Sequence, residues 1–144
     1  MQPLPHHYTV SSHSSSESNV TLAAEGLPDL ESAPPKEFDG PGDKWSPESL
    51  LVAAIADCFI LSFKAVAKAS KFDWLDLQCE VTGTLDKHKK VTRFVQFDVK
   101  ATLTISTDAK VDFATKLLEK AEQVCLITNS LAGESHLTTE IKTR

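Results

Sequence analysis

The stretch 46–69, SPESLLVAAIADCFILSFKAVAKA, decides the fold of this chain. Its opening serine can cap free helix amides, Pro47 suits the first helical position, and the acid Glu48 complements the helix dipole. No further proline or glycine follows in the stretch, and apolar residues occupy nearly every side of its first half. The sequence therefore predicts a central helix over 47–69 that is buried on all sides and forms the core.

The residues before this helix predict a hairpin and a loop. Residues 1–25 alternate loosely between polar and apolar positions around a serine-rich turn, which is typical of an N-terminal hairpin. The stretch 26–47 holds five of the seven prolines and three of the five glycines. We therefore expect a covering loop over 26–46.

The residues after the helix predict a layer of strands and a second helix. Alternating apolar positions on both sides of a polar turn predict a long antiparallel hairpin over 74–105. Helical spacing then predicts a helical segment over 108–131, with Cys125 at or just beyond the end of its helix, and an edge strand follows over 135–143. No repeat or linker divides the chain, so we expect a single domain over 1–144 with a two-layer α+β fold.

Composition and charge argue against several classes of protein. The 144 residues carry a formal charge of -5 and no basic stripe, so we expect no nucleic-acid partner. The amino terminus lacks the pattern of a secretory signal, and no apolar run reaches the roughly 18 residues that a membrane span needs. These features predict a cytoplasmic protein with no membrane partner. A long apolar helix in so small a chain favours a homodimer that covers it.

The three cysteines indicate free thiols, because their number is odd and their spacing is not that of a metal site. Cys58 lies inside the predicted central helix and Cys125 follows the second helix, so the two thiols could meet if the helices cross. A thiolate that attacks a peroxide becomes a sulfenic acid, and a second thiol nearby can condense with it before over-oxidation. The sequence alone also allows Cys58 to be an inert core thiol.

A reactive Cys58 needs a group that stabilises its thiolate, and the neighbouring sequence does not supply one. The two arginines, Arg93 and Arg144, lie far along the chain. A cation must therefore arrive through the fold or from lysines such as Lys36 and Lys44.

Two carboxylates also bear on this site. Asp57 falls inside the apolar run, where a carboxylate needs a partner or a wet cavity, and a cavity beside Cys58 would satisfy it. Glu48 lies ten residues before Cys58, which is about 15 Å along one helix, so it could serve only the cysteine of a partner whose helix runs antiparallel. The alternative is that Glu48 only satisfies the helix dipole.

The other candidates receive no predicted role. Cys79 falls on the same side of a predicted strand as the apolar residues, which is typical of a packed cysteine. Arg93 either exposes its guanidinium to solvent at a strand end or points into a pocket. His6, His7 and His13 lack a matching set of ligands, so no metal site is predicted.

Four stretches then follow one another as they do in a known family. They are PPKEFDGP at 34–41, WSPESLL at 45–51, AIADC at 54–58 and KAEQVCLITNSL at 120–131. Together they resemble the OsmC/Ohr family of osmotically inducible and organic hydroperoxide resistance proteins, over the chain from about residue 30 to its end. A Pro-Glu-x-Leu-Leu start, a cysteine ten residues past the glutamate, and a Cys-x-Ile-x-Asn-Ser segment form a fairly specific combination.

The resemblance implies a fold and a site. It implies an OsmC-like fold in which antiparallel sheets wrap around long central helices in an intertwined homodimer, with active sites at the subunit interface. By the same resemblance Cys58 is the peroxidatic cysteine, Cys125 is the resolving cysteine and Glu48 organises the site. The implied partners are a hydroperoxide and a dithiol or lipoyl reductant, and no metal or organic cofactor is implied.

One departure from the family pattern leaves two functions open. Characterised peroxidases of the family carry an arginine upstream of the helix with the thiolate, whereas the first arginine here is Arg93. A lysine such as Lys36 or Lys44 is a point charge and cannot reproduce the bidentate fork of an arginine. The leading hypothesis is a thiol peroxidase for organic hydroperoxides, and the alternative is a non-catalytic OsmC-like dimer that binds a small apolar ligand at the interface.

Overall fold

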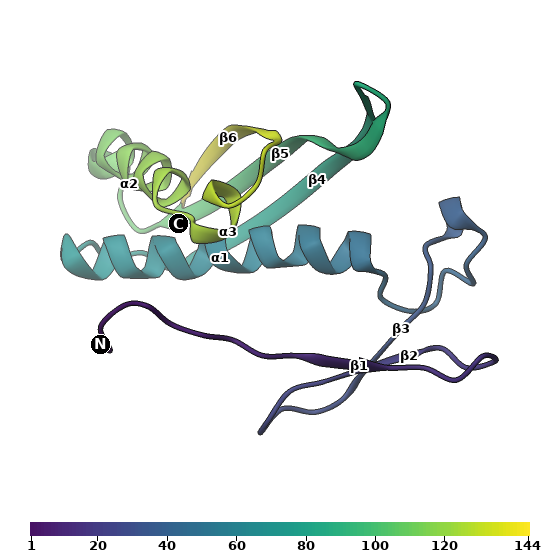
Figure 1. Cartoon of the computed structure of the whole chain (residues 1–144). Helices are drawn as coiled ribbons and strands as arrows, with labels where there is room; N and C mark the ends of the chain where they lie inside the picture. Colours follow the sequence, from purple (N-terminus) through teal and green to yellow (C-terminus); the bar gives the residue numbers. More distant parts are fainter. The chain divides into compact units, whose positions relative to one another are not determined.

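The computed structural model describes residues 1–144, which form two compact units, Met1–Leu50 and Leu51–Arg144. The boundary falls within the first turn of a long helix, α1 (Pro47–Ala69), which occupies the residues predicted for the central helix (Figure 1). The two units are connected through α1, and the single domain over 1–144 stays a prediction.

The Met1–Leu50 unit contains a small antiparallel sheet of order β1-β2-β3. Its strands are β1 (Ser11–His13), β2 (Val20–Ala23) and β3 (Leu30–Ser32). The first two form the hairpin expected within 1–25. The stretch expected as a loop over 26–46 is more ordered than predicted, because it contains β3 and a short 3-10 helix, η1 (Lys36–Phe38).

Helix α1 begins at a reciprocal serine cap. The backbone amide of Ser49 donates to Ser46 Oγ at 3.1 Å, and the amide of Ser46 donates to Ser49 Oγ at 2.9 Å. This is the arrangement of a capping box, with a serine in the place of the usual Glu or Gln. The predicted start of the helix therefore rests on hydrogen bonds that satisfy two otherwise free amides.

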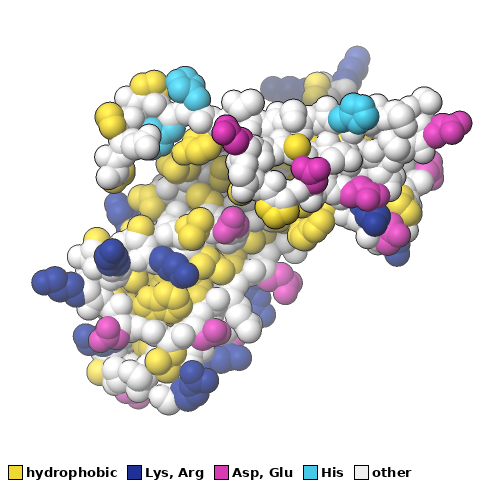
Figure 2. Space-filling view, turned by 90° about the horizontal axis from the view of Figure 1, so that it is seen from below, with side chains coloured by type: hydrophobic (Ala, Val, Ile, Leu, Met, Phe, Trp, Pro, Cys, Tyr) yellow, Lys and Arg dark blue, Asp and Glu magenta, His cyan; other side chains and the backbone are white.

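Within the chain, only one face of α1 is buried. Its buried residues Ile55, Phe59, Phe63 and Ala67 recur every four positions, as one stripe of an α-helix does. The prediction that the helix is buried on all sides is wrong for the single chain, since the other apolar positions are half-buried or exposed and Leu61 is 57% exposed. Figure 2 shows apolar side chains exposed among polar and charged ones on the face that it presents.

The Leu51–Arg144 unit contains a second sheet of order β4-β5-β6. Its strands are β4 (Asp76–His88), β5 (Val91–Ile105) and β6 (Glu134–Thr143). β4 and β5 form the long antiparallel hairpin, and β6 lies on the edge, as expected for 135–143. β6 runs parallel to β5, so the sheet is mixed and not purely antiparallel. The reason is that a helical crossover carries the chain back before β6 begins.

That crossover consists of α2 (Val111–Gln123), preceded by η2 (Asp108–Lys110), and the short α3 (Leu126–Asn129). The buried face of α2 joins the stripe of α1 and the alternate residues of β5 in one core. Fully buried members of that core include Phe59, Phe97, Leu103 and Leu118. The unit is therefore a layer of sheet and a layer of helices, and Cys125 lies where α2 ends and α3 begins.

By length and composition alone, α1 could also cross a membrane. The same is true of many core helices, and here Ile55, Phe59 and Phe63 pack against the sheet. The sequence analysis predicted that no run is apolar enough to span a membrane, and by length and composition α1 does meet that criterion. Packing of the buried stripe into a core is the role that the structure shows for this helix.

Candidate functional site

The structure brings Cys58 and Cys125 together. Cys58 lies in the middle of α1 and is half-buried, and Cys125 lies directly before α3 with 1% of its surface exposed. The two thiols lie close enough for each to shift the pKa of the other, although 67 positions separate them in the sequence. We call Cys58 and Cys125 the thiol pair.

Four donors surround the sulfur of Cys58. They are the thiol of Cys125, the hydroxyl of Ser62 at 3.8 Å, and the backbone amides of Ile127 and Leu126. Ser62 stands one turn after Cys58 on α1, so their side chains share a face of the helix. The two amides come from the first turn of α3, whose position therefore decides how well the sulfur is solvated by the protein.

These contacts lower the pKa of Cys58. Burial raises the pKa of the thiol, but the hydrogen bonds from Ile127, Cys125, Ser62 and Leu126 outweigh it, and the net direction is downward. Every stabilising group is a neutral donor. Within the single chain, hydrogen bonds lower the pKa of this thiol, and a cation beside Cys58 stays a prediction.

The pKa of Cys125 shifts in the opposite direction. Burial raises it, the hydroxyl and amide of Thr128 lower it, and the neighbouring Cys58 raises it further. The hydroxyl of Thr128 donates to Cys125 Sγ at 3.2 Å. Within the thiol pair, Cys58 therefore ionises first and Cys125 remains a thiol that donates to it.

The segment after α2 is fixed by Asn129, which stabilises the position of Cys125. The side-chain amide of Asn129 donates to the carbonyl of Gln123 at the end of α2 at 3.0 Å. Its backbone amide donates to the carbonyl of Cys125, also at 3.0 Å. One residue thus ties α3 to α2 and sets the direction of the amides that face Cys58.

Cys79 lies close enough to the thiol pair to interact with its charge. It is half-buried on β4 and packs against the core. Burial raises its pKa to about 11, and the charge of Cys125 adds to the effect. Cys79 is therefore a protonated, packed cysteine at neutral pH.

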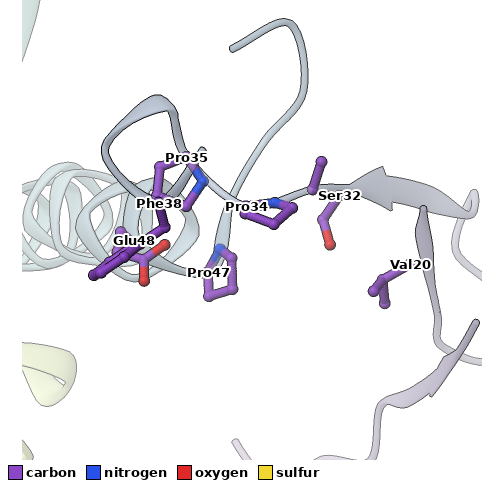
Figure 3. A pocket seen from close by; sticks show the side chains of 8 residues that line it. Val20, Ser32, Pro34, Pro35, Phe38, Pro47 and Glu48 are labelled. Atoms are coloured by element: carbon purple, nitrogen blue, oxygen red, sulfur yellow. The ribbon is translucent and has the colours of Figure 1, made fainter. Parts of the chain in front are cut away.

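Glu48 belongs to the other unit and lines a pocket there. The pocket has a volume of about 240 Å³, and its walls are Val20, Ser32, Ala33, Pro34, Pro35, Phe38, Pro47 and Glu48 (Figure 3). We call it the Glu48 pocket. The Oε1 atom of Glu48 is buried and has no hydrogen-bond partner. Glu48 and Cys58 stand ten positions apart on one continuous helix, so the single chain does not bring them into contact.

The basic residues considered for the site are engaged elsewhere. Lys44 Nζ lies 3.9 Å from Glu31 Oε1, and the side chain of Lys36 packs over Gly42. Arg93 is half-buried and donates to the carbonyl of Phe94 at 3.0 Å. None of these three side chains is bonded to Glu48.

A smaller expectation concerns Asp57. Asp57 is exposed on α1, so the wet cavity predicted for it is not needed, and that prediction is wrong. No cluster of three or more His, Cys, Asp or Glu side chains could hold a metal ion. The groups that sequence reasoning missed are Ser62, Thr128 and the amides of α3. Of these, the spacing of Ser62 from Cys58 was the only signal that could have been read in advance.

Known proteins with the same architecture can now be compared with this chain. Residues 40–140 match the family of OsmC-like proteins. The uncharacterized protein YmaD of Bacillus subtilis (strain 168) is 33% identical over 109 residues, which are 74% of this chain and 73% of that protein.

Two solved structures extend the comparison to nearly the whole chain. An OsmC-like protein of unknown function from Vibrio cholerae superposes with a TM-score of 0.84 at 20% identity, over 95% of this chain and 99% of that one. The organic hydroperoxide resistance protein OsmC from Legionella pneumophila superposes with a TM-score of 0.77 at 23% identity. The match covers 97% of this chain and 99% of that one. The predicted α+β fold of the OsmC type is confirmed.

Proposed function

Because the chain belongs to the family of OsmC-like proteins, we propose that it is a cysteine-based peroxidase that reduces organic hydroperoxides. Cys58 is the thiol that is oxidised, and Cys125 is the thiol that resolves it. One solved structure with this fold is named an organic hydroperoxide resistance protein, which supports the choice of substrate class.

The observation that carries the proposal is the contact within the thiol pair. A peroxidatic cysteine has to be a thiolate near neutral pH, and its resolving partner has to be a thiol within reach. Here the hydrogen bonds around Cys58 lower its pKa, and Cys125 is both its neighbour and the group whose pKa is raised. Two inert core cysteines would not need such opposite surroundings.

The proposed cycle uses only these two sulfur atoms and an external dithiol. The Cys58 thiolate attacks the terminal oxygen of the hydroperoxide, the O–O bond breaks, and the alkoxide takes a proton and leaves as an alcohol. Cys58 is now a sulfenic acid. The sulfur of Cys125 attacks it, water leaves, and a Cys58–Cys125 disulfide forms. A dithiol or lipoyl group then reduces this disulfide to two thiols and is itself oxidised to a disulfide.

Glu48 and a second subunit complete the proposal. Glu48 lies about 15 Å along α1 from Cys58 of its own chain. In a homodimer with antiparallel α1 helices, it would organise the site of the partner subunit. The uncovered apolar positions of α1, such as Leu61, supply the surface for such a dimer.

The test is peroxide consumption with a dithiol as the electron donor. We expect the wild-type protein to consume cumene hydroperoxide with dihydrolipoamide over many turnovers. Cys58→Ser should abolish consumption, and Cys125→Ser should consume about one equivalent and then stall, because no disulfide can form. Cys79→Ser is the matched control and should remain active. If the wild type consumes no organic hydroperoxide with any dithiol, the proposal is wrong.

A second candidate is a non-catalytic dimer that binds a small apolar ligand. The observation in its favour is the apolar Glu48 pocket, in which the carboxylate has no basic partner. The two candidates differ in the reactivity of Cys58. A kinetic pKa near the ordinary thiol value of about 8.5 would favour the binding protein, whereas a value well below 7 would favour the peroxidase.

A further inference from the structure

We propose that the hydroxyl of Thr128 activates Cys125 for its attack on the oxidised Cys58, and thereby limits over-oxidation of the Cys58 sulfur. The inference rests on the proposed function and adds a third side chain to the cycle. Thr128 lies in the first turn of α3, three residues after Cys125, and its hydroxyl donates to Cys125 Sγ at 3.2 Å.

The resolving step needs a nucleophilic sulfur. When Cys125 attacks the sulfenic acid, the S–S bond forms, the S–O bond of Cys58 breaks, and the departing hydroxide combines with the proton of Cys125 to give water. Negative charge builds on Cys125 Sγ as its proton leaves, because the thiolate is the nucleophilic form. Burial opposes this charge and raises the pKa of Cys125. A hydrogen-bond donor at the sulfur therefore favours the step.

Solvent is excluded from the sulfur of Cys125. The residue has 1% of its surface exposed, and a second subunit can only reduce this exposure further. The Thr128 hydroxyl takes the place of solvent there. Its hydrogen bond strengthens as the sulfur becomes negative, since charge-assisted hydrogen bonds are roughly twice as strong as neutral ones. It therefore stabilises the transition state of the attack more than the resting thiol.

The direction of the Thr128 hydroxyl differs from that of other hydroxyls on the helices. Helical Ser and Thr hydroxyls often bond to a backbone carbonyl one turn back. Thr115 does so on α2, where it donates to the carbonyl of Val111 at 3.0 Å. Ser130 does so at the end of α3, where it donates to the carbonyl of Leu126 at 2.8 Å. The hydroxyl of Thr128 bonds instead to the atom that reacts.

The backbone of α3 holds Thr128 in place. The amide of Asn129 donates to the carbonyl of Cys125 at 3.0 Å, and the amide of Leu131 donates to the carbonyl of Thr128 at 3.1 Å. Threonine is branched at Cβ, so few side-chain rotamers compete with the one that bonds to the sulfur. The contact is thus made within one short segment of a single chain and does not depend on a partner subunit.

The experiment measures how the Cys58 sulfenic acid divides between two products. Reduced protein is mixed with rising concentrations of cumene hydroperoxide and no reductant, and peptide mass spectrometry gives the fractions of Cys58–Cys125 disulfide and of Cys58 sulfinic acid. The hydroperoxide concentration that gives equal amounts reports the rate of resolution relative to over-oxidation. We expect Thr128→Val to lower this concentration about tenfold, and Thr128→Ser, which keeps the hydroxyl, to stay within about twofold of wild type. Equal values for wild type and Thr128→Val would overturn the proposal.

Control variants separate the hydroxyl from a general loosening of α3. Ser130→Ala removes a hydrogen bond of the same segment away from the sulfur and should divide its products as wild type does. If Thr128→Val fails to fold, Thr128→Ala removes the hydroxyl without a branched side chain. A loss in Ser130→Ala or Thr128→Ser as large as that in Thr128→Val would contradict the role of the hydroxyl.

Over-oxidation is measured separately in Cys125→Ser, which cannot form the disulfide. Adding Thr128→Val to that variant should leave the rate of sulfinic acid formation unchanged, and an altered rate would contradict the proposal. If wild type forms neither the disulfide nor sulfinic acid at Cys58, the peroxidase proposal is wrong and Thr128 has no such role. If wild type forms the disulfide and Thr128→Val behaves identically, only the role of Thr128 is wrong.

Discussion

At the scale of single residues, the two members of the thiol pair differ in what surrounds their sulfur atoms. Cys58 is half-buried among hydrogen-bond donors, and Cys125 is almost fully buried. The donors favour the thiolate and the burial favours the thiol. The pair thus joins a thiol of lowered pKa to a thiol of raised pKa.

The first prediction concerns the ionisation of Cys58. Alkylation of Cys58 by iodoacetamide should rise with pH and show a midpoint below the ordinary thiol value of about 8.5. Ser62→Ala and Cys125→Ala should each move the midpoint upward, because each removes a donor to the thiolate. Mass spectrometry of the labelled peptide measures the rate. A midpoint that Cys125→Ala leaves unchanged would contradict the role of that thiol as a donor.

The second prediction concerns Cys79 and alkaline pH. Its pKa is raised to about 11, so the folded protein keeps a proton that the unfolded chain loses at lower pH. The resulting stability is present below the ordinary thiol pKa and is lost as pH rises through about 11. Between pH 9 and 11, the unfolding free energy of wild type should therefore fall more steeply than that of Cys79→Val. Urea unfolding at several pH values gives both curves, and parallel curves would refute the assignment.

At the scale of elements, the ends of the helices hold the site in place. The serine cap fixes where α1 begins, and Asn129 fixes α3 against the end of α2. Between them lies the buried stripe of α1, which positions Cys58 one residue before Phe59.

The third prediction concerns the cap of α1. Ser46→Ala should lower the unfolding free energy by about 1 kcal/mol, because the amide of Ser49 loses its acceptor. Ser70→Ala is a suitable control, since Ser70 is exposed beyond the helix. Chemical denaturation followed by circular dichroism measures both changes. Equal effects of the two substitutions would show that the cap is not what stabilises the helix start.

The fourth prediction concerns the β4–β5 turn. Lys89 and Lys90 both have positive φ, at 51° and 70°, which is the geometry of a tight hairpin turn that favours Asn-Gly. Lys89→Asn combined with Lys90→Gly should raise the unfolding free energy by roughly 0.5–1 kcal/mol. Lys89→Ala with Lys90→Ala removes the same charges without relieving the backbone, and it should not stabilise the protein. If the double alanine variant gains as much unfolding free energy, the stabilisation comes from removing the two positive charges and not from the backbone.

Most helices and strands could be predicted from the sequence because local residue patterns mark them. Pro47 and the caps mark the start of α1 locally, and alternation marks β4 and β5, so these elements are predicted close to their observed bounds. The direction of β6 depends on the crossover that precedes it. Because no local pattern encodes that direction, the mixed sheet could not be predicted.

Less of the candidate site than of the fold could be predicted from the sequence. The sequence singles out Cys58 and Cys125 by chemistry, but their contact depends on how α1 and α3 pack. The hydrogen bonds that lower the pKa of Cys58 could not be predicted for the same reason. The stabilising donors include backbone amides of Leu126 and Ile127, which every residue has and no side-chain motif reveals.

At the scale of the whole molecule, the face of α1 that is not buried in the core favours association with a partner. Half-buried and exposed apolar positions remain on the helix after the core has formed, with Leu61 at 57% exposure. A chain of this size gains stability by covering such a face with a second copy. The Glu48 arrangement that we propose for catalysis depends on that second copy.

The fifth prediction tests this association. We expect wild type to sediment as a dimer, and Leu61→Glu to shift it toward the monomer, because a charge would be buried in an apolar contact. Lys116→Glu, a change at an exposed polar position of α2, is the control and should leave the dimer intact. Sedimentation velocity at several concentrations decides between the outcomes. A dimer that survives Leu61→Glu would place the interface on another surface.

The sulfur of Cys58 is surrounded by uncharged hydrogen-bond donors, which affects how its reactivity depends on salt concentration. A thiolate held by a lysine or arginine loses part of its stabilisation when dissolved ions screen the pair, whereas hydrogen bonds from neutral amides and hydroxyls lose little. The anion here is solvated by the fold much as water would solvate it. Its readiness to react should therefore stay nearly constant from dilute buffer to concentrated brine, including the high osmolarity of a cell that is losing water.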